Sequence, residues 1–162
     1  MGGSNSKDTR MIDDKHSVVD FMKQNANYVQ QQTQRVANAN SFYNYGDATN
    51  QITMLHGDVL HDMGYRGEGK IIAMLDAGFK NADNMSVFDS LRANNRILYT
   101  YDFVAHENNV YDDDSHGAMC FSTMGANIGG SMVGTAPEAS YILLRSEDAP
   151  TENIIEEYNW AT

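Results

Sequence analysis

Three short apolar segments stand out in the pattern of hydrophobic and polar positions: KIIAMLD at 70–76, RILYTYDFV at 96–104 and SYILLR at 140–145. All three are compact and rich in β-branched or aromatic residues, which favours strands over helices. The first is almost continuously apolar and stops sharply at an acid, a pattern typical of a strand buried on both faces. The pattern therefore predicts three strands.

Helical spacing of apolar residues separates these segments. It predicts helices over residues 17–36, 52–63, 85–95 and 116–126, and a last helix that Thr151 would begin. Turn-forming residues fill 38–50 and 127–134, which we expect to be a loop and a glycine-rich turn. The alternation of strands and helices implies an α/β fold with a parallel sheet and helices on its faces. In such sheets, chemistry lies beyond the carboxyl ends of the strands.

Composition and charge narrow the function classes. The chain has 162 residues, about one domain, and its formal net charge of −11 argues against nucleic acid as a partner, because a phosphate backbone requires a basic surface. The single cysteine, Cys120, excludes a disulfide within the chain. No apolar run approaches the ~18 residues of a membrane span. The first residues, MGGSNSKDTR, lack the apolar stretch of a signal peptide.

Two residues combine into candidate chemistry. Asp76 ends the first predicted strand, and Ala77 and Gly78 behind it allow a sharp turn that would point the acid into a crevice. His116 begins a predicted helix, and Gly117 leaves room beside it for a neighbouring segment. Taken singly, the aspartate would equally cap a turn and the histidine would more often lie on the surface. As a pair, a buried aspartate can orient an imidazole that serves as a general base near neutral pH.

The stretch around His116 also allows other kinds of site. The three aspartates at 112–114 offer oxygen ligands that suit Ca²⁺, but the D-x-D-x-D-G spacing and a closing glutamate are missing. His56 and His61 are five residues apart, rather than the four that place two zinc ligands on one helix face. Cys120 shares a helix face with His116, yet its apolar neighbours indicate an ordinary buried thiol. We therefore predict no metal ligands.

Three motifs, in chain order, resemble those of the subtilisin-like serine proteases. D-A-G at 76–78 follows an apolar strand like the family's D-[ST]-G, with alanine in place of the usual hydroxyl residue. H-G-A-M-C-F at 116–121 matches H-G-[ST]-x-[VIC]-[AG] in part, with Ala118 and Phe121 departing from it. G-T-A-P-E-A at 134–139 matches G-x-A-P-x-A throughout.

The resemblance covers about residues 41–162, and residues 45–79 are further similar to secreted members from Bacteroidota-type bacteria. It implies a subtilisin-like three-layer fold, with helices on both faces of a parallel sheet, incomplete at the C-terminus. It also implies a serine endopeptidase in which Asp76 orients His116, and His116 takes the proton of a serine that attacks a peptide carbonyl. Protein or peptide would be the substrate and no cofactor would be required. Calcium is common in the family but finds little support in these residues, and the family favours export or the cell envelope.

The nucleophile that the resemblance implies is missing from the sequence. The family's serine lies in a G-T-S-x-[AS] motif, which residues 1–162 do not contain, and Ser115 and Ser122 are poorly placed to replace it. We therefore expect this chain by itself to be inactive, with the missing C-terminal half of the peptidase domain as its partner. Residues 1–40 would be an N-terminal extension or the tail of a propeptide. The alternative is a non-catalytic parallel α/β binding module that keeps the motifs for structural reasons.

Overall fold

The structure, a computed structural model, describes residues 41–148. The chain divides into two units, residues 1–40 and residues 41–162, and the described residues all belong to the second. The helices predicted over 17–36 and from Thr151 onward therefore lie outside the described residues. Within residues 41–148, every helix is too short or too polar to cross a membrane.

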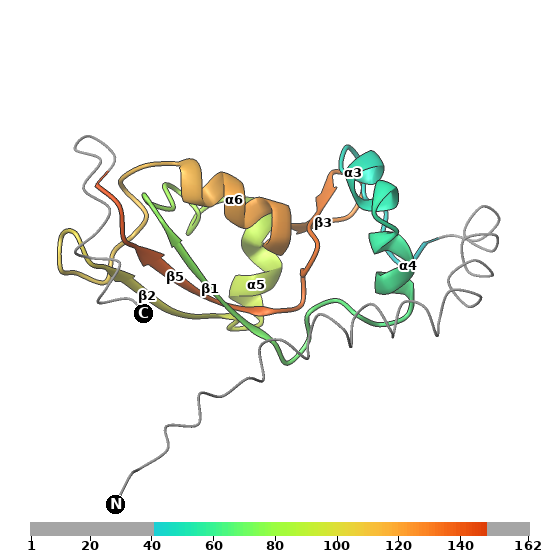
Figure 1. Ribbon diagram of the computed structural model, residues 1–162, viewed down its shortest axis with the longest axis horizontal. Helices are drawn as coiled ribbons and strands as arrows, with labels where there is room; N and C mark the ends of the chain where they lie inside the picture. Colours follow the sequence, from blue (N-terminus) through green and yellow to red (C-terminus); the bar gives the residue numbers. More distant parts are fainter. Residues whose placement is uncertain (1–40, 149–162) are drawn as a thin grey trace, which may run out of the picture. The chain divides into compact units, whose positions relative to one another are not determined.

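Short helices and strands alternate along the described chain (Figure 1). In chain order they are α3 (Thr49–Met54), α4 (Gly57–Asp62), β1 (Ile71–Asp76), η1 (Ser86–Phe88), α5 (Asp89–Ala93), β2 (Ile97–Asp102), α6 (His116–Gly125), β3 (Asn127–Ile128), β4 (Met132–Val133) and β5 (Ser140–Arg145). The three predicted strands correspond to β1, β2 and β5.

These three strands form one parallel sheet in the order β1-β5-β2. The last strand in the described chain therefore lies in the middle, where Leu143 is in register with Met74 of β1 and Thr100 of β2. The predicted α/β fold with a parallel sheet is confirmed. All three strands end at the same edge, which gathers Asp76, Asp102 and Arg145 beside one another.

Two predicted segments differ in detail from the structure. The helix expected over 52–63 is divided into α3 and α4, because His56 adopts the left-handed conformation at φ +55° and interrupts the helical hydrogen bonding. The glycine-rich turn expected over 127–134 is a small antiparallel hairpin of β3 and β4, in which Asn127 is in register with Val133.

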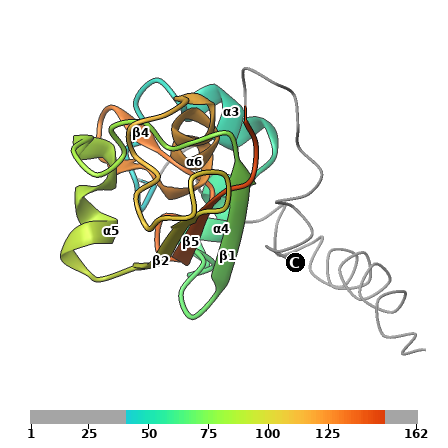
Figure 2. The ribbon, with the colours of Figure 1, turned by 90° about the vertical axis from the view of Figure 1, so that its left-hand side faces the viewer.

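One face of the sheet is buried under η1, α5 and α6 (Figure 2). Met74 of β1 and Leu143 of β5 join side chains of these helices in a single apolar core. Phe121 of α6 lies within it: its ring stacks on Phe88 with 4.1 Å between centroids and meets the Tyr141 ring edge-on at 4.8 Å. Each such side chain contributes roughly 1.5–3 kcal/mol on burial, so the core attaches α6 firmly to the sheet.

The opposite face of the sheet is partly open within residues 41–148. Ile71 of β1 exposes 64% of its surface and Tyr99 of β2 exposes 52%. The predictions of a first strand buried on both faces, and of helices on both faces, therefore do not hold within the described residues. The physical reason is that η1, α5 and α6 all pack into the core on one face, and the segment expected to form the next helix, from Thr151, lies outside the described residues.

The connections between the strands have opposite hands. The connection from β1 to β2 contains α5 and crosses the position of β5 in the sheet. The connection from β2 to β5 contains α6 and runs in the opposite direction, back toward β1. Both helices pack into the same core on the same face of the sheet. Two crossovers that run in opposite directions over one face cannot share a hand, so one of them is left-handed, although about 98% of such connections are right-handed.

Candidate active site

Asp76 is held at the carboxyl end of β1 by the turn that follows it. The residue is 7% exposed, and its Oδ1 accepts a hydrogen bond of 2.8 Å from the backbone N–H of Ala77. Gly78 then takes φ +149°, and a Cβ there would lie 2.7 Å from the backbone nitrogen of Asp114. Only glycine fits a turn this close to the loop before α6, and that turn directs the Asp76 carboxylate toward the first turn of the helix.

His116 is the first residue of α6 and lies opposite Asp76. Its backbone N–H donates to Asp114 Oδ1 at 2.7 Å, which satisfies one of the free donors at this helix start. A Cβ on Gly117 would lie 2.9 Å from the Cβ of Asp76 and closer still to the Gly78 carbonyl oxygen. The absence of a side chain at position 117 therefore lets the helix approach the end of β1.

The structure brings the two predicted site residues together in one hydrogen bond. His116 Nδ1 lies 2.8 Å from Asp76 Oδ1. A carboxylate can only accept, so the imidazole carries its proton on Nδ1 and leaves Nε2 as a hydrogen-bond acceptor. The imidazole side chain is 62% exposed, whereas that of Asp76 is 10% exposed. The pair thus presents a basic nitrogen to solvent from a fixed, buried anchor.

The same contact changes the basicity of the imidazole. The hydrogen bond to Asp76 raises the pKa of His116 above its ordinary value, and the charges of Asp76, Glu147 and Asp114 act in the same direction. These carboxylates come from the end of β1, from the segment after β5 and from the loop before α6. A histidine with a raised pKa is a stronger base than a free imidazole, and it loses its basic, neutral form as the pH falls through that pKa.

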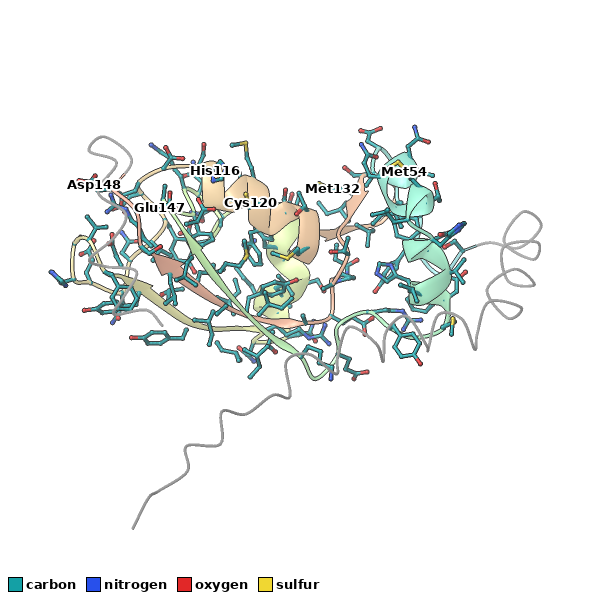
Figure 3. The ribbon with its side chains drawn as sticks, viewed as in Figure 1. Met54, His116, Cys120, Met132, Glu147 and Asp148 are labelled. Carbon is teal, nitrogen blue, oxygen red and sulfur yellow. The ribbon has the colours of Figure 1, made fainter. Side chains whose placement is uncertain are left out.

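Cys120 belongs to the same group of side chains, as its four-residue spacing from His116 allowed. It lies one turn after His116 on α6 (Figure 3), and its Sγ is 3.9 Å from both ring nitrogens. Burial, with Asp76 as the second cause, raises the pKa of the thiol. The thiol is half-buried against the Asp76–His116 pair, so the expectation of an ordinary buried cysteine describes its packing but not its neighbours.

Arg145 is a site residue that sequence reasoning missed. It ends β5, is 7% exposed, and its Nε donates to the carbonyl oxygen of Ala77 at 3.0 Å. Its Nη1 lies 2.8 Å from Asp102 Oδ2 and 3.1 Å from Asp113 Oδ2. One guanidinium thereby joins the ends of all three strands to the acidic loop. The available signal was a lone basic residue closing a buried apolar strand, because such a charge needs partners.

The acidic loop at 112–114 is held by protein donors rather than left as a free charged run. Asp112 Oδ2 accepts from Asn109 Nδ2 at 2.8 Å, Asp113 pairs with Arg145, and Asp114 caps His116. Each carboxylate is engaged by a protein donor, so the loop positions the start of α6.

Ser115, Ser122 and His61 contribute nothing comparable. Ser122 Oγ donates to the carbonyl oxygen of Met119 at 2.7 Å, and Ser115 is the residue directly before His116. His61 is buried, with Nδ1 2.9 Å from the Tyr45 hydroxyl and Nε2 3.0 Å from the Thr135 carbonyl oxygen. With both nitrogens engaged, His61 has none to offer a metal ion.

Comparisons with known proteins add no identification. No protein-family model matches the chain, and no curated protein matches it. What can be concluded about function therefore comes from the residues and their geometry.

Proposed function

We propose that this chain is the N-terminal part of a subtilisin-like serine endopeptidase, in which Asp76 and His116 are two of the three catalytic residues. The observation that supports this most directly is the 2.8 Å contact from Asp76 Oδ1 to His116 Nδ1. It lies at the carboxyl edge of a parallel sheet, the position where such folds place their chemistry. The order of the two motifs and the G-T-A-P-E-A segment at 134–139 point to the same family.

The proposed mechanism assigns one task to each residue. Asp76 keeps the proton on Nδ1 and stabilises the imidazolium that forms during the reaction. His116 Nε2 accepts the hydroxyl proton as a serine attacks a peptide carbonyl, and later returns it to the leaving amine. The exposed side of the imidazole is where the serine and the peptide would approach. The serine itself comes from sequence outside residues 1–162.

The first test is to read the coding sequence beyond Thr162 for a G-T-S-x-[AS] stretch. If it is present, the longer product is expected to be labelled by a fluorophosphonate on that serine. His116→Ala is expected to prevent labelling, because the serine then has no base to remove its proton. A matched control is His106→Asn, since His106 is exposed and left-handed at φ +58°, a conformation that asparagine tolerates.

Three outcomes would contradict the proposal. The motif would be absent from the gene, the longer product would resist the phosphonate, or the probe would label a serine within residues 1–162 of the isolated chain. An absent motif would leave the binding-module alternative as the better description.

A further inference from the structure

We propose that Asp76, His116 and Cys120 together form a binding site for a thiophilic divalent metal ion such as Zn²⁺. One carboxylate oxygen, one imidazole nitrogen and one sulfur lie within 4.8 Å of one another. Oxygen, nitrogen and sulfur ligands of these types are those that Zn²⁺ accepts in proteins. Among the residues that the structure describes, this is the one group of three such side chains.

The three ligand atoms are near enough for one ion to reach them after the side chains adjust. With Zn–S near 2.3 Å and Zn–N and Zn–O near 2.1 Å, ligand atoms stand about 3.4–3.6 Å apart. Here Asp76 Oδ1 is 2.8 Å from His116 Nδ1, and Cys120 Sγ is 3.9 Å from Nδ1. The Oδ1–Nδ1 distance must lengthen by about 0.6 Å and the Sγ–Nδ1 distance must shorten by about 0.3 Å. Because Sγ is equally far from both ring nitrogens, the exposed imidazole must also turn so that its Nδ1 lone pair faces the ion.

The three ligands are fixed relative to one another by the fold. His116 and Cys120 are four residues apart on α6, so they lie on one face of the helix. Gly117 holds that face against the end of β1, where the turn at Ala77 anchors Asp76. The exposed imidazole leaves an open side through which an ion enters and on which water completes the coordination.

The surrounding charge favours a cation at this place. Glu147 and Asp114 both act electrostatically on His116, and Glu147 also acts on Cys120. Figure 3 shows Glu147 just beyond β5, toward the same end of the sheet as His116. These carboxylates add to the negative charge of Asp76, so they strengthen the attraction for a divalent ion.

The proton balance of binding is defined. The Cys120 thiol loses its proton to solvent and binds as the thiolate. The metal takes the lone pair of His116 Nδ1, and the Nδ1 proton moves to Nε2. With a neutral imidazole, one proton is therefore released per ion.

The consequence for catalysis rests on the proposed function. A proton on Nε2 and a metal on Nδ1 leave His116 with no nitrogen to accept the proton of a serine. The bound ion also takes the Asp76 carboxylate away from its orienting role. Zinc would therefore act as an inhibitor of the peptidase at the site of the base itself.

The binding test uses Cd²⁺ as a probe with the full chain of 162 residues. Because the chain has a single cysteine, a thiolate-to-Cd²⁺ charge-transfer band in the ultraviolet reports Cys120 alone. We expect saturation at one ion per chain, loss of the band in Cys120→Ser, and at least tenfold weaker binding in both Asp76→Asn and His116→Ala. His106→Asn is the control and is expected to bind as the parent does.

Two results would overturn the metal site. One is the absence of any band in the folded parent. The other is binding of parent affinity in Asp76→Asn and His116→Ala, which would mean that the thiol acts by itself. The His116 ring signals provide a second readout: Cd²⁺ is expected to shift them in the parent, and unshifted signals at saturation also contradict the site.

A separate measurement keeps the two proposals distinguishable. In the longer product, Zn²⁺ is expected to inhibit peptide hydrolysis. Cys120→Ser is expected to raise the inhibition constant for Zn²⁺ at least tenfold above that of the parent, with the activity of each protein normalised to its own zinc-free rate. Metal binding without hydrolysis would refute the proposed function and leave the metal site standing. Hydrolysis that zinc leaves unchanged, together with the absence of a Cd²⁺ band, would refute the metal site and leave the proposed function standing.

Discussion

His61 and His116 occupy contrasting surroundings in the same small structure. His61 is 2% exposed, stacks on Tyr45, and has a partner for each ring nitrogen. His116 is largely exposed, with Nδ1 hydrogen-bonded to Asp76 and the Cys120 sulfur 3.9 Å from Nε2. The two rings also carry opposite tautomers, which follow from their partners.

The partner of each nitrogen determines which tautomer is present. The carbonyl of Thr135 can only accept, so His61 carries its proton on Nε2 and accepts at Nδ1 from the Tyr45 hydroxyl. Burial raises the pKa of Tyr45 to about 12, which keeps that hydroxyl protonated as a donor. A histidine with both nitrogens engaged stabilises the fold. A histidine with one anchored and one open nitrogen can exchange protons, and this contrast can be tested residue by residue.

The largest expected effect comes from removing His116, whose Nε2 is open to solvent. In the longer, serine-containing product, His116→Ala is expected to abolish peptide hydrolysis, a loss of about 10⁶-fold in kcat of the kind seen when the base of such a triad is removed. Folding should be nearly unchanged because the side chain is exposed. Steady-state kinetics and a denaturation curve measure the two effects. Activity comparable to the parent would refute the role of His116.

Changing the anchor sharpens the comparison further. Asp76→Asn is expected to reduce kcat about 10⁴-fold, because an amide no longer fixes the Nδ1–H tautomer. The pKa of His116 should fall toward its ordinary value, since the hydrogen bond to Asp76 is the main cause of its rise. The rate, which increases as His116 loses its proton, should then reach its half-maximum at lower pH. A titration followed through the His116 ring protons checks the shift, and an unchanged pKa would contradict the anchor role.

The buried histidine should show the reverse pattern. His61→Ala leaves the Tyr45 hydroxyl and the Thr135 carbonyl without their partner, so we expect it to lower the free energy of unfolding by about 2–4 kcal/mol. Urea denaturation of the chain measures this. Cd²⁺ binding by the folded molecules should stay as in the parent, because the described contacts of His61 include neither Asp76 nor His116. If His61→Ala instead lost metal binding and kept its stability, the structural role assigned to His61 would be wrong.

The smallest effect is expected from the partner of His61. Tyr45→Phe removes one hydroxyl and leaves His61 Nδ1 without a donor, which should lower the free energy of unfolding by about 1–2 kcal/mol. The ring itself is retained, so the apolar cluster with Ile52 and Val133 is preserved. A destabilisation equal to that of His61→Ala would show that the hydrogen bond to Tyr45 accounts for the whole effect, and would contradict a contribution from ring stacking and from the Thr135 carbonyl.

Local sequence patterns predicted the parts of the fold that depend on local chemistry. The three strands were predictable because each is a compact apolar run, and His116 was predictable as a helix start beside a glycine. The interruption at His56 was not, because a left-handed residue other than glycine gives no reliable signal. The sheet order was equally hidden, since it is decided by contacts between segments far apart in the chain.

The candidate site likewise has residues that local sequence could predict and residues that it could not. The Asp76–His116 pair could be proposed from two motifs, and the spacing of Cys120 from His116 placed both on one helix face. Arg145 could not be proposed, because its importance arises from neighbours that come from other elements. Arg145 contacts Ala77, Asp102 and Asp113, and none of these is near it in sequence. The same is true of His61, whose five-residue spacing from His56 argued against zinc without revealing its buried hydrogen bonds.

The central position of β5 has a consequence for how the chain folds. Strands β1 and β2 do not pair with each other, since β5 lies between them and forms both ladders. As the chain is synthesised, Asp76 and His116 exist before any strand pairing of the sheet is possible, and the contacts that complete it span long stretches of sequence. Such non-local pairing slows folding. The contact between Asp76 and His116 would therefore be completed in the last cooperative step, when β5 inserts between β1 and β2.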